Sequence, residues 1–336
     1  MATHDAPRRR PTAQDVARAA GVSRATVGFV LNDTPSQTIS EPTRRAVLAA
    51  AERLGYVPSA AARTLRSGRS RLVLCVVPPW ATTEALSAFV QRTAAELHAL
   101  GYVTVTHVTT TSSLRDLLAA ASPAAVISLA PVDPADETRL RTLRIPCVHG
   151  YLLDYPGHPH TLPLTQQTMG ALQAGHLRER GFERLVYVQP ADVGHPGRAD
   201  GRYTGALTGA GGPPVERSVY AGTEALAALV RGWADDPRRT GLCAFDDLTA
   251  LELLAALDRA GVDVPGHVGV VGVDDSSAAP FAHPPLTSVR FNLTTQARDL
   301  AAWVHAAVRH GPAIPADTPP PATDEPPAQL VVRAST

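Results

Sequence analysis

Two pairs of adjacent carboxylates are the most conspicuous residues in this chain that could do chemistry. Asp246-Asp247 and Asp274-Asp275 each follow a short apolar run. Two carboxylates in one cleft can hydrolyse a glycoside, one as acid and the other as base or nucleophile. The same positions also have a helix-capping explanation, in which one carboxylate of a pair caps the next turn and the other faces a cleft. The sequence gives no sign of the strongly apolar pocket that a catalytic acid needs, so helix capping is favoured over catalysis.

The familiar motifs of catalysis and cofactor binding are missing from the sequence. It contains no Gly-x-Ser-x-Gly, no His-Glu-x-x-His, no Gly-x-Gly-x-x-Gly at a strand end and no phosphate-binding glycine loop after a strand. His158 and His160 could clip a metal, but without a nearby Cys a polar loop is the favoured interpretation. We therefore expect a protein that is not an enzyme, with no cofactor and no metal site.

From Leu72 onward, short apolar strands alternate with amphipathic helices. Strands are predicted at residues 72–78, 103–108, 124–131, 145–151, 184–190, 215–220, 241–247, 267–275 and 329–333. Helices are predicted at residues 85–100, 165–180, 202–210, 224–233 and 248–260. This alternation predicts two consecutive α/β units, each a parallel sheet with helices on both faces. Ligands bind such sheets at the carboxyl ends of the strands, so one site is expected in a cleft between the units.

Two aromatic side chains are candidates for walls of that cleft against which a ligand ring could stack. Phe89 lies on the first predicted helix of the body, and Tyr151 ends the fourth predicted strand. Simple core packing is an equal alternative for Phe89.

The net charge of zero conceals an asymmetry along the chain. Residues 1–71 carry 12 Arg and 5 acidic residues, a charge of +7, whereas residues 72–336 carry 19 Arg and 26 acidic residues, a charge of −7. A small basic head on a large acidic body is typical of a polyanion-binding module joined to a separate sensor. A basic disordered tail is the alternative, but the head has strong helical patterning.

The sequence also predicts a compartment. No apolar run reaches the roughly 18–20 residues needed to cross a bilayer, and no apolar stretch follows the basic N-terminus as in a secretory signal. Cys75, Cys147 and Cys243 are far apart in apolar segments, which favours buried, reduced thiols. A cytoplasmic protein with no membrane partner is therefore expected.

Three short helices are predicted in the head. Thr12 caps the first and Gly21 ends it; Ser23 caps a second helix that runs to about Leu31, and a third follows Ser40. The residues predicted to face inward are Val27, Val30 and Leu31 on the second helix and Val47, Leu48, Ala51 and Leu54 on the third. Two short helices joined by a glycine turn and followed by a supporting helix form a helix-turn-helix.

A short helix is also predicted between head and body. Ser59 can cap a helix that runs to Arg66, shorter than the roughly 12–15 residues an isolated helix needs in water. We expect this hinge to fold only when two copies pack together on DNA. Leu65 could instead belong to the body's core, but the polar run from Arg66 to Arg71 argues against it.

The head resembles that of the lactose/galactose-repressor (LacI/GalR) family. The resemblance covers PTAQDVARAAGVSRATVGFVLN and ISEPTRRAVLAAAERLGYVPSAAARTLRSGRSRLV, including the Gly-Tyr-x-Pro turn at Gly55 and an Ala-rich hinge. The body resembles the family more loosely, most clearly in Gly175-His176-Leu177, Arg180-Gly181-Phe182, AFDDLTALELLAALDRAGVDVPGHVGVVGVDD, HPPLTSVR and LVVRAST. The resemblance implies a periplasmic-binding-protein-like body whose chain crosses between its two subdomains near Leu164, Ser288 and Ile314.

The resemblance implies how the head meets DNA. In that family the second helix lies in the major groove, so the base-reading positions are Arg24, Ala25 and Phe29. Phe29 and its neighbour Gly28 depart from the family's usual residues. Phosphate contacts are implied for Thr12, Ser23, Thr26 and Asn32. In the hinge, minor-groove contacts are implied for Ser59, Ala62 and Leu65, with Leu65 as the wedge that kinks the duplex.

The resemblance also implies effector contacts. It assigns Asp246 and Asp274 to the ligand, and it matches the family's ligand-clamping Arg-x-x-Gly to Arg198, with Arg202 as the alternative. Asp246 stands where the family commonly has Asn, which favours a ligand rich in hydrogen-bond donors. Phe291 replaces a residue that is often polar in the family and is a further candidate contact. For either arginine, a solvated surface position is an equal alternative.

Together these inferences predict a homodimeric regulator of transcription that binds a near-palindromic operator in double-stranded DNA. A repressor is the first expectation and an activator the alternative. The effector is expected to be a sugar, a related polyol or a nucleoside, acting as inducer or corepressor. The predicted domains are a head at 1–57, a hinge at 58–71 and a body at 72–336, with subdomains 72–164 plus 289–314 and 165–288 plus 315–336. The alternatives are a sugar-binding protein or sugar-acting enzyme on the same α/β fold, and a structural DNA-bending protein, which would leave the body without a role.

Overall fold

The computed structural model describes most of the chain as two compact units. The described residues are 11–31, 39–56, 70–79, 83–109, 114–129, 132–150, 166–194, 196–212, 214–311 and 326–336. The first unit, Met1–Ser70, is called the head here, and the second, Arg71–Thr336, the body.

Several residues singled out in the sequence lie outside the described residues. They are Asn32 of the head, Ser59, Ala62 and Leu65 of the hinge, Tyr151, His158, His160, and the crossover positions Leu164 and Ile314. The roles assigned to them stay predictions.

The head consists of α1 (Ala13–Ala20), α2 (Arg24–Leu31) and α3 (Glu41–Leu54). Thr12 and Asp15 form a capping box, in which the Asp15 amide donates to the Thr12 hydroxyl (3.4 Å) and the Asp15 carboxylate accepts from the Thr12 amide (2.9 Å). Gly21, at φ 65°, ends α1 in the left-handed region that glycine adopts at little cost. The Ser23 hydroxyl then accepts from the Thr26 amide at 3.1 Å, as predicted for the start of the second helix.

The core of the head is small and is made mostly of short side chains. Its fully buried members are Val16, Ala17, Val27, Val30, Val47, Ala50 and Ala51, with Leu31 packed against them at the edge. Leu48 and Leu54 were predicted to face this core, and that prediction is wrong, since they are 47% and 36% exposed. The third helix instead buries Ala50, because α1 and α2 together cover only a narrow stripe of α3.

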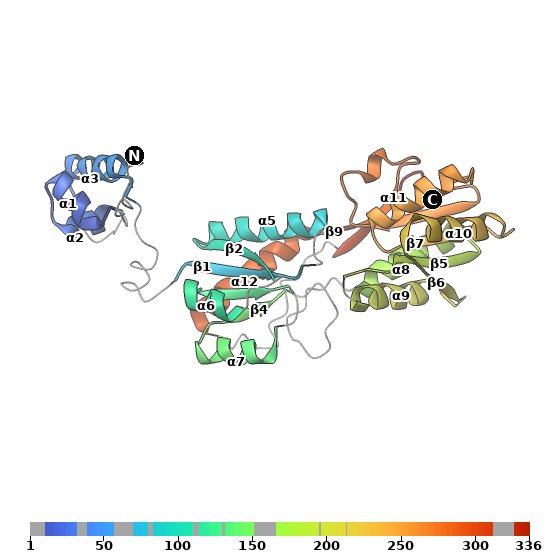
Figure 1. Cartoon of the computed structure of the whole chain (residues 1–336), viewed down its shortest axis with the longest axis horizontal. Helices are drawn as coiled ribbons and strands as arrows, with labels where there is room; N and C mark the ends of the chain where they lie inside the picture. Colours follow the sequence, from blue (N-terminus) through green and yellow to red (C-terminus); the bar gives the residue numbers. More distant parts are fainter. Residues whose placement is uncertain are drawn as a thin grey trace, which may run out of the picture. The chain divides into compact units, whose positions relative to one another are not determined.

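The first lobe of the body is built on a four-stranded parallel sheet with strand order β2-β1-β3-β4. Its strands are β1 (Leu72–Val77), β2 (Val103–Val108), β3 (Ala125–Ser128) and β4 (Cys147–His149). Its helices are α5 (Glu84–Ala99), α6 (Leu114–Ala121), α7 (Pro134–Thr142) and α12 (Leu293–His310). Because side chains alternate along a strand, Val73 and Cys75 face the core under α5 and α12, while Leu74 and Val76 face α6 and α7. Figure 1 shows α5 on one side of this sheet and α6 and α7 on the other.

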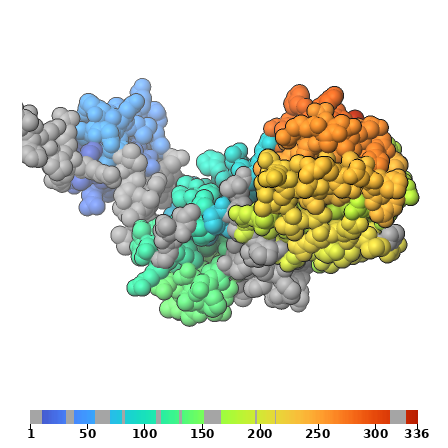
Figure 2. Space-filling view, turned by 45° about the vertical axis from the view of Figure 1, so that its right-hand side comes forward, coloured from blue at the N-terminus to red at the C-terminus, as the bar shows by residue number. Residues whose placement is uncertain are grey.

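The second lobe contains a six-stranded sheet with strand order β10-β9-β8-β7-β5-β6, in which only β10 is antiparallel to its neighbour. The strands are β5 (Arg184–Pro190), β6 (Val215–Tyr220), β7 (Thr240–Ala244), β8 (Val268–Val273), β9 (Thr287–Phe291) and β10 (Ala328–Val331). Helices α8 (Gln166–Glu179) and α9 (Pro196–Gly209) cover one face, and α10 (Gly222–Ala234) and α11 (Asp247–Arg259) cover the other. Figure 2 shows this lobe, coloured from yellow to orange, as one closed mass of side chains.

The architecture predicted from the alternating pattern is therefore confirmed: a helix-turn-helix head and an α/β body with two sheets. Four elements were missed in the sequence, namely α6, α7, β9 and α12. Strand β9 stays in the second sheet to Phe291, beyond the crossover predicted near Ser288, and the chain then enters α12 of the first lobe. Among the described residues, no helix is long and apolar enough to cross a membrane.

Candidate DNA interface and effector site

The second helix of the head presents the side chains assigned to base reading. Arg24 and Ala25 are exposed, and Phe29 is half-buried but lies outside the cluster that forms the head's described core. An aromatic ring in this position is available to a partner surface, since Val27 and Val30 already fill the inward face of α2.

Three of the residues assigned to phosphate contact lie at the starts of α1 and α2. The Thr12 hydroxyl donates to the Asp15 carboxylate at 2.7 Å, and the hydroxyls of Ser23 and Thr26 are 2.9 Å apart on the exposed surface. Helix N-termini carry positive partial charge and favour phosphate. All three residues therefore lie at helix starts, where a phosphate would be favoured.

The carboxyl edge of the second lobe's sheet brings the two predicted acids together. Asp246 follows β7 and caps α11, where its carboxylate accepts from the amide (2.8 Å) and hydroxyl (2.7 Å) of Thr249. Asp274 follows β8, and its amide donates to the carbonyl of Val289 at 3.0 Å. Its φ of 112° is unfavourable for a residue with a side chain, and strain of this kind is often retained at functional sites.

Both predicted arginines lie on one face of α9. Arg198 and Arg202 are one helical turn apart, and both are buried, at 8% and 2% exposed. Their guanidinium carbons lie 4.9 and 4.6 Å from the ring centre of Phe245, so this one ring packs against both cations. Arg202 also donates from Nε to the Gln166 side chain at 2.7 Å and from Nη1 to the carbonyl of Phe245. The sequence left open whether Arg198 or Arg202 is the ligand clamp, and the structure places both guanidinium groups beside Phe245.

Electrostatics couple these residues. Burial, with help from Asp246 and Asp247, raises the pKa of Asp274 from 3.8 to about 7, against the opposing effect of Arg202 and Arg198. Burial and the neighbouring Arg202 lower the pKa of Arg198 to about 10, against the opposing effect of Asp274 and Asp246. A cluster of two cations and two acids thus shares one poorly solvated region, in which ionic and hydrogen-bonding ligand groups are strongly recognised.

A second layer of contacts holds the loop that carries Asp274. Asp247, 3% exposed, accepts from the Ser276 amide and the Ser288 hydroxyl, both at 2.6 Å. Burial is the main reason that the pKa of Asp247 is raised. The Ser288 hydroxyl in turn accepts from the Asp275 amide at 3.0 Å.

Asp275 completes this layer by pairing with two arginines from the last strands. Its carboxylate lies 2.6 Å from Arg290 of β9 and 2.7 Å from Arg333, which follows β10. The second member of each acidic pair therefore belongs to the scaffold. Of the first members, Asp246 also caps α11, and Asp274 lies at the edge of the sheet.

Phe89 and Phe291, the two described aromatic candidates for ligand contact, differ in how much of the ring is exposed. Phe89 is 2% exposed and packs in the first lobe's core, so the structure gives it the core-packing role and offers no exposed ring for stacking. Phe291 is half-buried and packs against the cluster of Met169, Val273 and Val289 at the end of β9, so only part of its surface is free.

Two aromatic residues at this edge were missed in the sequence. Phe245 precedes the predicted Asp246 by one position, and Tyr220 ends β6, with its hydroxyl donating to Glu252. Placement directly after or at the end of a strand was the signal that could have found both. Groups of His, Cys, Asp or Glu able to hold a metal are absent from the described part of the chain.

Glycines at the crossing of α8 and α9 set the position of the two arginines. A Cβ at Gly205 would lie 2.6 Å from the carbonyl carbon of Gln167, and one at Gly209 would lie 2.6 Å from the Cα of Ala171. A Cβ at Gly170 would lie 2.8 Å from the carbonyl carbon of Arg202 itself. The two helices thus approach backbone to backbone, which leaves the Arg202 side chain directed at Gln166 and Phe245.

Comparison with known proteins matches both units. Residues 12–59 match the family of bacterial regulatory proteins named for lacI, and residues 174–336 match the periplasmic binding protein-like domain. The chain is 31% identical over 185 residues to the HTH-type transcriptional regulator GntR of Pseudomonas aeruginosa, covering 53% of each chain. It is 51% identical over 70 residues to the HTH-type transcriptional regulator CelR of Thermobifida fusca, covering 21% of this chain and 20% of the relative. The chain thus spans about half the length of the first of these relatives and about a fifth of the other.

Solved structures extend the likeness to the whole fold. The Lac repressor dimer bound to operator and the anti-inducer ONPF superimposes with a TM-score of 0.75 at 21% identity, covering 97% of this chain and 99% of that one. The CelR–cellobiose complex superimposes with a TM-score of 0.61 at 26% identity, covering 97% and 100%. Residues 12–59 therefore form a head of the LacI family of bacterial regulatory proteins, and residues 174–336 form a periplasmic binding protein-like domain.

Proposed function

We propose that this protein is a homodimeric transcription regulator, a repressor in the first instance, that binds a near-palindromic operator. A small polyhydroxylated effector bound at the carboxyl edge of the second lobe's sheet controls its operator affinity. The observation that carries this proposal is the cluster of Arg198, Arg202, Asp246 and Asp274 around Phe245, in a body joined to a helix-turn-helix head.

DNA binding is supported by the chemistry of the head. Arg24 is exposed on α2, and an arginine there can pair with a guanine through two hydrogen bonds, worth roughly 1–3 kcal/mol of discrimination. Phe29 on the same helix offers an apolar contact to thymine methyl groups. The proposed phosphate contacts at Thr12, Ser23 and Thr26 set the register of the helix without reading sequence.

The ligand class follows from the donors and acceptors of the site. Carboxylates accept hydrogen bonds from hydroxyl or amine groups, and guanidinium groups donate to ring or hydroxyl oxygens. A sugar, polyol or nucleoside presents both kinds of group. Support also comes from the family, since the superimposed CelR structure contains cellobiose.

The homodimer is supported by apolar side chains left at the surface of the body. On the edge strand β2, Val103, Val105 and Val108 are 54%, 48% and 46% exposed. In the second lobe, Phe281 is 88% and Leu248 is 67% exposed. Exposed apolar side chains on an edge strand favour association in solution, and a second copy of the chain would bury them.

The proposed coupling runs through the hinge at residues 58–71. A ligand that changes the relative orientation of the two lobes changes the spacing of the two hinges in the dimer, and the hinge folds only when paired. Such coupling is typically about 1–3 kcal/mol, or roughly 5–150-fold in operator affinity. Leu65 is proposed to wedge between base steps, so Leu65→Ala should reduce DNA bending and weaken operator binding.

The test begins by selecting binding sites from random double-stranded DNA with the full-length protein. We expect a near-palindromic sequence. Anisotropy titrations of that sequence, with and without a panel of sugars, polyols and nucleosides that includes cellobiose, then identify the effector.

The Asp274→Asn variant should fold normally and lose its response to the effector, while the control Asp258→Asn, at an exposed position of the same lobe, should keep it. If no specific sequence is selected, the DNA-binding proposal is wrong. If Asp274→Asn responds like the wild type, the proposed effector site is wrong.

A further inference from the structure

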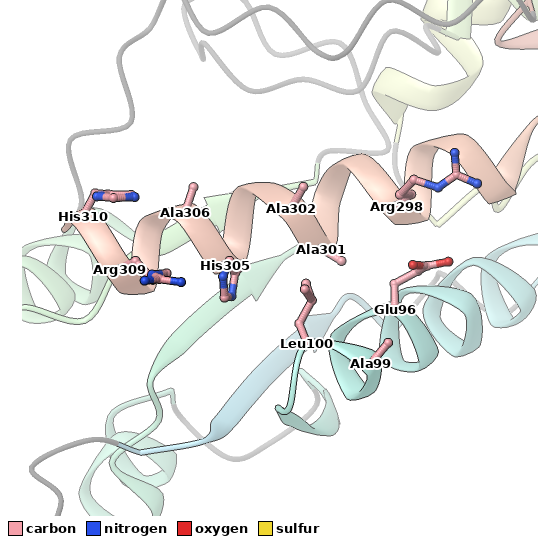
Figure 3. A pocket seen from close by; sticks show the side chains of 10 residues that line it. All are labelled: Glu96, Ala99, Leu100, Arg298, Ala301, Ala302, His305, Ala306, Arg309 and His310. Atoms are coloured by element: carbon pink, nitrogen blue, oxygen red, sulfur yellow. The ribbon is translucent and has the colours of Figure 1, made fainter.

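A groove runs between α5 and α12 on the first lobe, on the opposite side of these helices from the sheet core. Its volume is about 510 Å³, within the roughly 300–1,000 Å³ of small-molecule sites. It is lined by Glu96, Ala99 and Leu100 of α5 and by Arg298, Ala301, Ala302, His305, Ala306, Arg309 and His310 of α12 (Figure 3). None of these residues belongs to the proposed effector site, whose residues all lie in the second lobe.

Small side chains make up much of the lining of the groove. Positions 301, 302 and 306 of α12 and 99 of α5 are all alanine, so the two helices pack closely while their outer edges leave room. Leu100 is 43% exposed at one end and adds an apolar surface. An apolar ring or short chain would fit over such a floor and displace water from it.

The charges around the floor are unequal at the two ends. In Figure 3, His305 and Arg309 lie on the side of α12 that faces α5, with His310 beyond them at the helix end, and Glu96 and Arg298 lie at the other end. Neither Arg298 nor Arg309 makes a hydrogen bond or ion pair in the part of the chain that the structure describes. The His305 Nδ1 lies 3.1 Å from the Tyr102 hydroxyl, which holds the imidazole in place. One end is therefore cationic, and the other balances a cation with an acid.

This pattern complements an organic anion with a single charge. A guanidinium and an imidazole at one end can bind a carboxylate, and a guanidinium offers it two parallel hydrogen bonds. At the opposite end the charges of Glu96 and Arg298 offset each other, so nothing there favours a second negative charge and a dianion gains little over a monoanion. A small carboxylic acid with an apolar body meets both requirements.

The groove also lies next to the start of the body. Leu100 is followed by Gly101, whose carbonyl accepts a hydrogen bond from Nε of Arg71 at 2.5 Å. Arg71 is the first residue of the body, directly after the head unit ends at Ser70. Leu100, which lines the groove, is therefore adjacent in sequence to a residue that is hydrogen-bonded to the start of the body.

We propose that this groove is a second small-molecule site, which takes a monocarboxylate with an apolar body and holds its carboxylate between Arg309 and His305. The site lies on α5 and α12 of the first lobe and is separate from the proposed effector site in the second lobe.

The test is calorimetric titration of the full-length protein, without DNA, with benzoate and with the neutral benzyl alcohol. We expect benzoate to bind about tenfold or more tightly than benzyl alcohol, because only the anion can use the charge-assisted hydrogen bonds. Arg309→Ala should weaken benzoate binding by about tenfold, and Ala302→Trp should abolish it by filling the groove. Arg259→Ala, which removes an exposed arginine from the last turn of α11, is the matched control and should leave binding unchanged.

Three results would overturn the proposal. One is the absence of measurable benzoate binding up to about 10 mM, well above the Kd expected for a specific small-ligand site. Another is unchanged binding in Arg309→Ala and Ala302→Trp, which would place benzoate elsewhere. The third is phosphate binding more tightly than benzoate, which would mean a site for a dianion. Since no DNA is present, failure here leaves the operator and effector proposals unaffected.

Discussion

The crossing of α8 and α9 allows a sharp test of how the effector site is built. In Gly205→Ala, the added methyl would lie 2.6 and 2.7 Å from the carbonyl carbon and Cα of Gln167. Carbon atoms in contact prefer about 3.5–4.0 Å, so the helices must separate by about 1 Å. The opposing atoms are backbone, and no side-chain rotation can relieve the clash.

The size and sign of the effect follow from two opposed contributions. Overpacking costs about 1–3 kcal/mol, and more where the neighbours cannot move. Alanine in a helix interior gains back up to about 1 kcal/mol over glycine. Because the opposing atoms are backbone, the upper end of that cost applies, and we expect Gly205→Ala to lower the free energy of unfolding of the body by about 2 kcal/mol. The α9 helix should also shift, and with it Arg198 and Arg202, so the effector response should weaken.

Gly232→Ala in α10 is the matched control. Nothing lies within 4 Å of the position that its Cβ would take, so this substitution should be neutral or should stabilise by about 0.5–1 kcal/mol. Urea denaturation followed by circular dichroism measures both variants. Equal unfolding free energies for the two variants would refute the close-packing argument.

Three further predictions concern single residues. Because the pKa of Asp274 is raised from 3.8 to about 7, the folded body holds a proton that the unfolded chain releases between these two pH values. This stabilisation is complete below about pH 4 and is lost as the pH rises through 7. In Asp274→Asn the free energy of unfolding should therefore vary less with pH in that range. Burial, with help from Arg180, lowers the pKa of His176 below its usual 6.5, so stability should fall as the pH drops below 6.5, and His176→Gln, measured by the same pH series, should remove that loss. Thr12→Ala removes a cap of α1 and should cost the head about 0.5–2 kcal/mol, seen as a lower melting temperature of the head and weaker operator binding, whereas an unchanged melting temperature would mean that the capping box contributes little.

The sequence was most informative where structure is determined locally. The caps at Thr12 and Ser23 depend on residues three positions apart, and each was predicted correctly. The strands of the body could be found because buried parallel strands form short apolar runs. Leu48 and Leu54 were misplaced because helical spacing defines a stripe without saying which edge of it two small neighbouring helices cover.

The proposed effector site was only partly predictable, because its residues come from elements far apart in the chain. Asp246 and Asp274 follow strands, and strand ends converge at one edge, so their proximity could be inferred. The role of Phe245 depends on Arg198 and Arg202, which reach it from a helix more than forty positions earlier, so no local pattern marks it. Phe89 shows the opposite error, since an aromatic residue near a predicted cleft was equally consistent with the core position that it occupies.

The two members of each acidic pair differ in how firmly the fold holds them, and this difference has a consequence for evolution and design. Asp247 and Asp275 are fixed by buried hydrogen bonds and ion pairs, so substitutions there should be paid for in folding. Asp246 and Asp274 sit one position earlier. Replacing Asp246 also removes the cap of α11, at a cost of about 0.5–2 kcal/mol, whereas Asp274 is held through its backbone amide, so a change of its side chain mainly alters what the sheet edge presents. Under the proposed function, a lineage could explore new effectors by drifting at these two positions. A library that randomises them while keeping their neighbours constant should yield folded regulators with altered ligand preference far more often than one that randomises both members of each pair.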